Sequence, residues 1–494
     1  MPSPAPLPGY AELHCLSNFS FQRGASHPKE LVARAAQLGY QALALTDECS
    51  VAGVVRAWEA AKECGLHLIV GSEFVWGDLR LVALARDAQG WGNLCEFITA
   101  ARAAAPKGQY HVGPGSPFSL LQGCELLLAP CRERMGASDF VAVRACLSSA
   151  RAQFGLNFDG HLWLAVELHL APDDSLWLAT LQRAGAALGL PLVAAGDVHM
   201  HARSRKPLQD VITAVQRGCS VAECGFALQP NAERHLRQRV RLAGIYPPEL
   251  LAATLTVAAR CTFSLGEIRY QYPLETVPPG MTPAQALAWL AQEGAMGRYP
   301  QGVPDWIAAQ IRKELALIAH CQYEMYFLTV HDIVRFARSQ GILCQGRGSA
   351  ANSVVCYVLG ITAVNPEDSH LLFERFISKE RSEPPDIDVD FEHDRREEVI
   401  QYIYAKYGRE RAAITAVVAT YRTRSALRDV GKALAVAPAL VDAFAKDHHW
   451  FDEGIAADRL QELAKGLGVP LHRHTAALWL ELAAPLKGFP RHLS

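Results

Sequence analysis

Short runs of apolar residues alternate with longer segments of helical periodicity over the first half of the chain. In residues 28–38 the apolar positions recur every three or four residues, Ser26 stands as the expected N-cap, and Gly39 marks the end. This pattern predicts a helix with one buried face. Strands that alternate with helices are typical of a parallel α/β barrel. The apolar runs expected to form strands are Ala42–Thr46, His67–Val70, Leu81–Ala85, Leu126–Ala129, Leu162–Val166 and Leu192–Ala195.

Polar residues follow the ends of the expected strands. In barrels of this kind, functional side chains gather where the strands end, at the carboxyl side. We therefore expect a polar site at that end of a barrel domain that spans residues 1–275. The residues in these positions are Asp47, Glu73, Cys131, Glu167, Asp197 and His199.

A second domain is expected over residues 276–430, because polar and proline-containing sequence at residues 278–283 marks a junction. Within it, Asp394 and Glu397 predict a capping box at the start of a helix that Gly408 ends. Further patterns predict helices at residues 311–319 and 330–340, a strand at 414–418, and a helix-rich segment over 431–494.

Three carboxylates, Asp386, Asp388 and Asp390, occupy every second position of a segment whose other members are Ile387, Val389 and Phe391. In a strand they would project together while the apolar set faces a core. Like charges this close repel, so the arrangement favours divalent cations. Paired ions roughly 3.5 to 4 Å apart stabilise both oxygens of a phosphoryl displacement. The alternative is an acidic edge strand with solvated carboxylates.

A glycine loop, Gly346-Arg347-Gly348-Ser349, precedes these carboxylates and leads into apolar positions with helical spacing at residues 354–359. Ser349 is the expected cap of that helix. Open amides at a helix start attract anions, and Arg347 can hold a phosphate with its planar guanidinium. Taken alone, the loop is more often simple helix capping. A carboxylate strand close behind it favours a phosphate-binding interpretation.

Together these residues resemble the C-family bacterial DNA polymerases, the alpha subunits of replicative polymerase III and their error-prone relatives. The resemblance covers essentially the whole chain. Segments 12–15, 18–21, 23–28 and 46–50 look most like the error-prone, damage-inducible branch. The polymerase motifs are residues 346–353, 372–376 with Lys379 and Arg381, 385–391 and 428–431.

The resemblance implies a nucleotidyltransferase-type α+β palm over 276–430 and the start of a helical thumb over 431–494. In the palm, Asp388 and Asp390 would bind two catalytic Mg²⁺ ions, with Asp386 a neighbour. The loop residues Gly346, Arg347, Gly348 and Ser349 would meet the phosphates of the incoming nucleotide.

The implied reaction is error-prone, translesion-type DNA synthesis, in which deoxynucleoside triphosphates extend a primer on a DNA template. In the family a third catalytic carboxylate arrives on a later strand, and no later aspartate of this chain stands in such a context. We therefore expect an N-terminal portion that is weak or inactive alone. A sliding clamp and other translesion proteins would bind through regions outside this chain.

The N-terminal half resembles the polymerase-and-histidinol-phosphatase (PHP) domain, a metal-binding barrel that hydrolyses phosphoesters in intact members. The positions that look like its ligands are His14, Glu73, Cys131, Asp197 and His199.

Four other positions depart from the PHP pattern: Leu16, Arg23, Glu48 and Arg80. Arginine repels metal ions and leucine cannot coordinate them, so the site is expected to be degenerate. It would hold one residual divalent ion such as Zn²⁺ or Mn²⁺, or be purely structural. A PHP-type phosphoesterase or exonuclease, and a non-catalytic DNA-binding fragment, are the alternative functions.

Composition fits a soluble intracellular enzyme of about three domains, with 50% hydrophobic and 20% charged residues. No segment approaches the roughly 18 apolar residues of a membrane span, and residues 1–8 lack signal-peptide features. We therefore expect a cytoplasmic protein without membrane contact. The 13 cysteines include no Cys-x-x-Cys pair, which indicates reduced thiols and neither a disulfide framework nor a zinc ribbon.

A net charge of −2 means that any contact with nucleic acid must come from local patches. Arg424, Arg428 and Lys432 recur every four residues. On a helix they form a stripe that can follow a phosphate backbone. The alternative is an ordinary solvated helix face.

Overall fold

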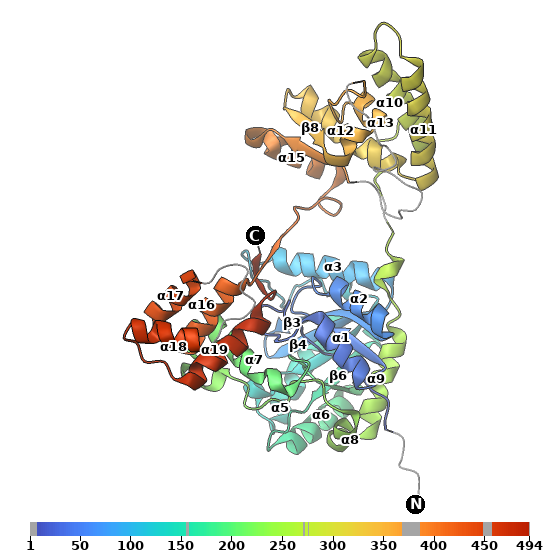
Figure 1. Ribbon diagram of the computed structural model, residues 1–494. Helices are drawn as coiled ribbons and strands as arrows, with labels where there is room; N and C mark the ends of the chain where they lie inside the picture. Colours follow the sequence, from blue (N-terminus) through green and yellow to red (C-terminus); the bar gives the residue numbers. More distant parts are fainter. Residues whose placement is uncertain are drawn as a thin grey trace, which may run out of the picture. The chain divides into compact units, whose positions relative to one another are not determined.

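The computed structural model describes residues 7–154, 158–269, 272–274, 276–367, 386–447 and 457–493. The chain forms two compact units (Figure 1). The first unit comprises residues 1–268 and 416–494, and the second comprises residues 269–415. These units do not coincide with the expected segments 1–275, 276–430 and 431–494, because the C-terminal residues belong with the barrel. Among the described residues, no helix has the length and apolar character needed to cross a membrane.

A seven-stranded sheet, with strands in chain order, forms the centre of the first unit. The expected barrel of parallel strands is wrong in one respect, because β4 runs antiparallel to both β3 and β5. A two-residue turn at Gly77 and Asp78 joins β3 to β4, and so short a connection permits only an antiparallel pair. The strands are β1 (Ala11–Glu12), β2 (Ala42–Leu45), β3 (His67–Trp76), β4 (Leu79–Ala85), β5 (Cys124–Pro130), β6 (Leu162–Glu167) and β7 (Leu192–Ala195).

Backbone hydrogen bonds beyond β1 and β7 nearly close the sheet into a barrel. The amide of Val198 donates to the carbonyl of His14 at 2.9 Å, and the amide of Leu16 donates to the carbonyl of Val198 at 2.8 Å. Cys15 and Val198 form the corresponding parallel bridge. The first and last strand ends therefore meet, which brings residues 14 and 197 to one place.

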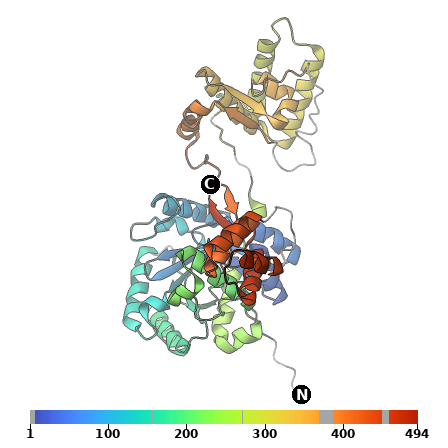
Figure 2. The same ribbon diagram turned by 60° about the vertical axis from the view of Figure 1, so that its left-hand side comes forward.

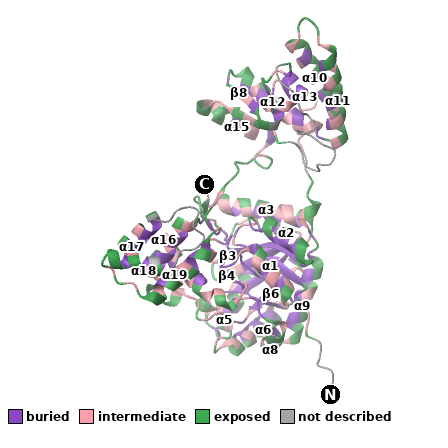
Figure 3. Ribbon diagram, viewed as in Figure 1, coloured by how far each residue is buried: buried purple, intermediate pink, exposed green. Residues whose placement is uncertain are grey.

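Alternate strand residues face the barrel interior, as the pleat of a strand requires. Many of them are small, such as Ala44, Ala129 and Ala165, and helix α9 (Pro248–Arg260) packs Val257 and Ala258 against them. The other face of each strand packs against the surrounding helices, and Figure 3 shows buried residues concentrated along the strands. Those helices are α1 (Pro28–Gln37), α2 (Val54–Cys64), α3 (Ala88–Ala103), α4 (Arg132–Met135), α5 (Phe140–Phe154), α6 (Asp174–Leu188), α7 (Lys206–Arg217) and α8 (Arg239–Ile245).

Helix α1 confirms the predicted helix, and Gly39 follows its end in the left-handed conformation at φ +69°. The expected cap is wrong, however, because His27 and not Ser26 occupies the N-cap position. The hydroxyl of Ser26 instead hydrogen-bonds Nδ1 of His201 at 2.8 Å and accepts the amide of His201 at 2.9 Å. A tertiary contact has taken the side chain that local pattern assigned to the helix.

The C-terminal segment forms a lobe on α7, which Figure 2 shows beside it. Leu208 and Val211 of α7 share a hydrophobic core with Leu427 and Trp479. The expected strand at 414–418 is wrong in its bounds, since strand β10 runs Val418–Thr420 and pairs antiparallel with β11 (Pro490–Leu493). The lobe is helix-rich as predicted, with α16 (Thr423–Ala433), α17 (Pro438–Asp447), α18 (Ala457–Gly466) and α19 (Arg473–Leu486).

The second unit packs helices against a two-stranded sheet. The helices predicted at 311–319 and 330–340 lie in α11 and α12, with Gln340 as the C-cap of α12. The elements are α10 (Pro283–Arg298), α11 (Asp305–Cys321), α12 (Glu324–Ser339), β8 (Cys344–Arg347), α13 (Val354–Val358), β9 (Asp388–Phe391) and α15 (Arg396–Tyr407).

Two expected helix caps in this unit are wrong. Ser353 and not Ser349 caps α13, because its hydroxyl accepts the amide of Cys356 at 3.0 Å. Helix α15 begins after Arg395, and Asp394 lies in the preceding 3-10 turn and forms no capping box. The predicted end at Gly408 is confirmed, at φ +81°.

Replacing Trp479 by alanine is expected to destabilise the C-terminal lobe by about 3 to 5 kcal/mol. Trp479 is completely buried, and its indole N–H donates to the carbonyl of Leu427 at 2.7 Å. Trp289→Ala is the matched control, because Trp289 is 45% exposed. Urea unfolding measures both changes, and equal losses for the two variants would contradict this account of the lobe.

Candidate functional site

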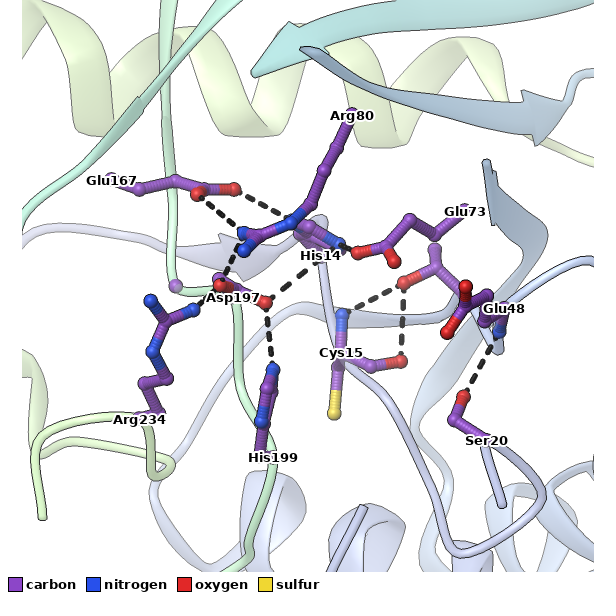
Figure 4. Close-up of polar contacts among 12 residues, drawn as sticks. His14, Cys15, Ser20, Glu48, Glu73, Arg80, Glu167, Asp197, His199 and Arg234 are labelled. Atoms are coloured by element: carbon purple, nitrogen blue, oxygen red, sulfur yellow. Dashed lines mark hydrogen bonds and ion pairs between the residues drawn. The ribbon is translucent and has the colours of Figure 1, made fainter. Parts of the chain in front are cut away.

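The imidazole of His14 lies between two carboxylates at the mouth of the barrel (Figure 4). Its Nδ1 donates to Oε1 of Glu167 at 2.6 Å, and its Nε2 donates to Oε2 of Glu73 at 2.7 Å. Glu167 is the last residue of β6, whereas Glu73 lies within β3, which runs past the expected end at Val70. Both ring nitrogens therefore act as donors, which requires a protonated imidazole.

Three arginines complete this cluster. Arg80 on β4 donates to Oδ2 of Asp197 at 2.7 Å and lies 3.6 Å from Glu167. Arg23, in the loop after β1, donates to Oε1 of Glu73 at 2.6 Å and also pairs with Glu48. The third, Arg234, pairs with Asp197 and lies 3.1 Å from Glu133. Four cations, His14, Arg23, Arg80 and Arg234, thus face the four inner carboxylates of Glu48, Glu73, Glu167 and Asp197.

The pKa values of the cluster follow from this pairing. Burial disfavours the charged form of His14, but the carboxylates of Glu167 and Glu73 outweigh it and raise the His14 pKa to about 9. Burial likewise opposes ionisation of Glu73, yet Arg23 and His14 hold its pKa well below the usual value. Burial and the nearby Arg80 lower the pKa of Arg234 to about 10. At neutral pH the cluster is therefore a set of ionised, mutually neutralising groups.

Of the five expected PHP ligands, the structure brings three together. Ligand atoms of His14, Glu73 and Asp197 all lie within 4.8 Å of one another, and all three residues are buried. His199 lies outside this group of three but contacts it, with its Nε2 2.9 Å from Oδ1 of Asp197. Burial and the nearby arginines lower the pKa of His199 far below its ordinary value, so it is neutral.

Cys131 does not join this group. It follows β5 and lines a pocket of ≈ 260 Å³ together with Arg80, Glu167 and Arg234. Burial raises the pKa of its thiol.

The donor set at the barrel mouth does not fit a metal ion, because cations and histidine N–H groups already hold its oxygens. The oxygens of Glu73 accept from His14 and Arg23, and those of Asp197 bond His199 and Arg80. A divalent ion would have to displace these groups against the repulsion of neighbouring positive charge. The guanidinium groups supply the positive charge that metal ions supply in a coordinated site.

Arg234 is the residue of the cluster that the sequence pattern missed. It comes from the irregular segment between α7 and α8, where no periodicity marks it. Glu167 was placed at a strand end but was not predicted as the partner of His14. Arg23 and Arg80, by contrast, were visible as departures from the ligand pattern.

The glycine loop and the carboxylate strand lie side by side in the second unit. Strands β8 and β9 pair antiparallel, with Arg347 opposite Asp388. Asp388 and Asp390 are exposed, while Val389 packs against the core of the unit. The alternation predicted from sequence is therefore confirmed, and Arg347 donates to Oδ1 of Asp390 at 2.9 Å.

The two glycines of the loop are needed for different structural reasons. A Cβ at Gly346 would lie 2.5 Å from the carbonyl oxygen of Ile361, so the absence of a side chain there allows the two backbone segments to pack closely. Gly348 has φ +65°, and a Cβ there would lie 3.4 Å from Oδ2 of Asp388. The backbone of Ser349 lies in the short 3-10 helix Gly348–Asn352. The motif residues 372–376, Lys379 and Arg381 lie outside the described residues.

The carboxylates of Asp388 and Asp390 fit a magnesium site in donor chemistry, since they are exposed oxygen ligands on one face of a strand. Strand β8 contributes no carboxylate beside them, because its residues are Cys344, Gln345, Gly346 and Arg347.

The basic stripe lies on α16, as its spacing predicted. Arg424 and Lys432 are exposed. Arg428 is half-buried, with its Nε 3.7 Å from Oδ1 of Asp442. Two of the three charges are thus presented to solvent and one is partly neutralised.

Comparison with known proteins shows which families this chain matches. Residues 12–152 match the PHP domain family, and residues 285–494 match the bacterial DNA polymerase III alpha NTPase domain. The chain is 55% identical over 495 residues to the error-prone DNA polymerase of Dechloromonas aromatica, which covers 99% of this chain and 47% of that protein. It is 54% identical over 503 residues to the error-prone DNA polymerase of Bordetella parapertussis, with the same coverage. The chain spans about half the length of these curated relatives.

Fold and site thus define a chain that joins a barrel-like PHP domain to a polymerase III alpha NTPase domain. These matches confirm the resemblance to the C-family bacterial DNA polymerases, most like the error-prone branch. A solved structure of a candidate metal-dependent phosphoesterase from Bifidobacterium adolescentis is 19% identical and covers 39% of this chain and 88% of its own, with a TM-score of 0.28. A score that low supports no functional argument.

Raising the pH from 6.5 to above 9 is expected to remove up to about 3 kcal/mol of stability from the barrel. The folded pKa of His14 is about 9, above the ordinary 6.5. Its contribution is therefore complete below pH 6.5 and lost as the pH rises through 9. The lowered pKa values of Glu73 and Glu167 work in the opposite direction, since their contribution is lost as the pH falls below about 4.5.

Urea unfolding at several pH values measures this dependence in the parent chain and in His14→Gln, which should lose the slope between pH 6.5 and 9. His169→Gln is the matched control. Burial lowers the pKa of His169 far below 6.5, so removing it should leave that slope unchanged. A parental slope in His14→Gln would show that His14 is not the titrating group.

Proposed function

We propose that this chain acts in template-directed DNA synthesis of the error-prone, translesion type, adding deoxynucleotides to a primer 3′ end. The observation that carries the proposal is the contact between the glycine loop and the exposed face of β9. There Arg347, Asp388 and Asp390 lie together. Similarity to error-prone polymerases over nearly the whole chain supports it.

In this proposal Asp388 and Asp390 hold two magnesium ions. Magnesium bound there supplies charge neutralisation of the triphosphate and activation of the primer hydroxyl. Arg347 now pairs with Asp390. Its planar guanidinium can exchange that carboxylate for a phosphate of the incoming nucleotide, which leaves Asp390 open to a cation. The left-handed Gly348 keeps the loop clear of side-chain atoms next to Asp388.

We expect the chain alone to extend primers slowly or not at all. The resemblance implies a third catalytic carboxylate on a later strand, and β8 brings none to the strand that carries Asp388 and Asp390. Phosphoryl transfer depends on positioned charge, so loss of one ligand of three is a large perturbation.

The barrel, in the same proposal, has a structural role. Proximity of His14, Glu73 and Asp197 favours the alternative of a PHP-type phosphoesterase. The arginines on the same carboxylates argue against it. Release of phosphate that is sensitive to chelators, and abolished by Asp197→Ala or His199→Ala, would support the phosphoesterase.

Primed DNA and deoxynucleoside triphosphates are the proposed substrates. The stripe on α16 is the proposed contact with the DNA backbone, through Arg424 and Lys432 above all, since both are exposed. A sliding clamp and other translesion proteins remain proposed partners. A cytoplasmic location remains part of the proposal.

The double variant Asp388→Ala, Asp390→Ala should abolish whatever primer extension the chain shows with magnesium or manganese, by about 100-fold or more. Asp386→Ala is the matched control, since it removes the neighbouring carboxylate and should preserve activity. Extension on a short primed template measures the rate. Metal-dependent binding of a fluorescent deoxynucleotide measures the site when the rate is too low.

Two results would count against this proposal. Extension or nucleotide binding that survives in the double variant would show that the site lies elsewhere. Robust processive synthesis by the chain, lost in the double variant, would keep the site but refute the expected weakness.

Replacing Arg424 and Lys432 together by alanine should weaken binding to primed DNA and lower the slope of log affinity against log salt by about 1 to 2. Lys29→Ala with Lys62→Ala removes the same charge from exposed positions on α1 and α2 and is the control. Fluorescence anisotropy at rising salt gives both slopes. Equal slopes in the two double variants would mean that the α16 stripe is an ordinary solvated face.

A further inference from the structure

Two cysteines outside both sites face each other in the segment between α7 and α8. The sulfur atoms of Cys219 and Cys224 lie 3.5 Å apart. Both residues are free thiols. Neither contributes to the barrel cluster or to the glycine loop.

The local backbone explains why they meet. Helix α7 ends at Arg217, and Gly218 turns the chain in the left-handed conformation at φ +68°. A 3-10 turn, Val221–Glu223, follows, and the hydroxyl of Ser220 donates to Glu223 at 2.7 Å. This tight turn returns Cys224 to Cys219, and its thiol donates to the carbonyl of Ser220 at 3.4 Å.

The two thiols differ in their surroundings. Cys224 is buried in the core that α7 shares with the C-terminal lobe. Cys219 is half-buried and lines a groove together with Ser220, Lys432 and Val436. A small oxidant therefore reaches Cys219 first. Burial raises the pKa of the Cys224 thiol, and its contact with Cys219 adds to the effect, so Cys224 is the less reactive of the two toward peroxide. Its sulfur lies 3.5 Å from that of Cys219, which places it to react in the second step.

We propose that Cys219 and Cys224 are a modification site at which a hydroperoxide drives formation of an intramolecular disulfide. The sulfur of Cys219 attacks hydrogen peroxide and breaks the O–O bond, which gives a sulfenic acid and one water. The sulfur of Cys224 then attacks that of Cys219 and expels the hydroxyl group, which leaves as a second water with the Cys224 proton. The two thiols lose two electrons, and the peroxide is reduced to two waters.

The geometry suits this reaction. A disulfide requires the sulfurs to approach to about 2.05 Å, so the pair needs only a small closure within one tight turn. A dithiol reductant reverses the change by thiol–disulfide exchange. The bond would close the turn that follows α7 covalently, between residues 219 and 224.

Peptide mapping of the full chain tests the proposal directly. Trypsin cleaves after Arg217 and Arg234, so peptide 218–234 carries Cys219 and Cys224 and no other cysteine. After mild hydrogen peroxide and alkylation, this peptide should lack both alkyl groups and be lighter than the reduced peptide by two hydrogen atoms. Dithiothreitol should restore both alkylation sites. Exposed Cys64 reports the general oxidation in the same digest.

Single variants separate the disulfide from independent oxidation. In Cys219→Ser, oxidation of Cys224 should slow by about tenfold or more, because its raised pKa leaves little thiolate. In Cys224→Ser, Cys219 should retain one oxygen or more after peroxide. The proposal is overturned if both cysteines stay alkylatable at a dose that oxidises Cys64. It is also overturned if the disulfide forms only in urea, or if each cysteine gains oxygen independently. Circular dichroism confirms that each variant is folded.

Discussion

Mutual neutralisation of four cations and four carboxylates at the barrel mouth is the interaction on which the first unit depends. Its members lie on or after β1, β2, β3, β4, β6 and β7 and in the segment before α8. Ionised groups in a buried place are stable only while paired, and loss of one partner leaves an expensive uncompensated charge. The cluster therefore holds strand ends together through charge.

Helix α7 connects this cluster to the C-terminal lobe. Its Gln209 donates to Nδ1 of His199 at 2.9 Å, and His199 in turn bonds Asp197. On the same helix, Leu208 and Val211 pack into the core that contains Leu427 of α16. Helix α7 thus supports the helix that carries the exposed charges of α16, and it contacts the cluster through the buried Gln209. Through these contacts the barrel can support the C-terminal lobe, which is consistent with the structural role proposed for it.

Much of this arrangement could be predicted from local pattern. Strand and helix periodicity gave the barrel, and alternation of Asp388 with Val389 gave the exposed carboxylate face. Arg23 and Arg80 were recognisable because arginine cannot replace a metal ligand. Arg234 could not be predicted, since it reaches Asp197 from a distant irregular segment. The caps predicted at Ser26 and Ser349 were wrong, because Ser26 makes a tertiary contact instead and a later residue caps the helix in place of Ser349. The packing of residues 416–494 on α7 could not be predicted either, because it joins residues that are far apart in the sequence.

Manganese binding at the barrel mouth tests the central claim most directly. The chain with Asp388→Asn and Asp390→Asn removes the competing site in the second unit, and electron paramagnetic resonance of free Mn²⁺ then reports binding to the rest. The account predicts no saturable loss of the free-ion signal, because arginines and protonated His14 already neutralise the carboxylates. Stoichiometric binding that disappears in His14→Gln would contradict it, and would show that the barrel retains a working metal site.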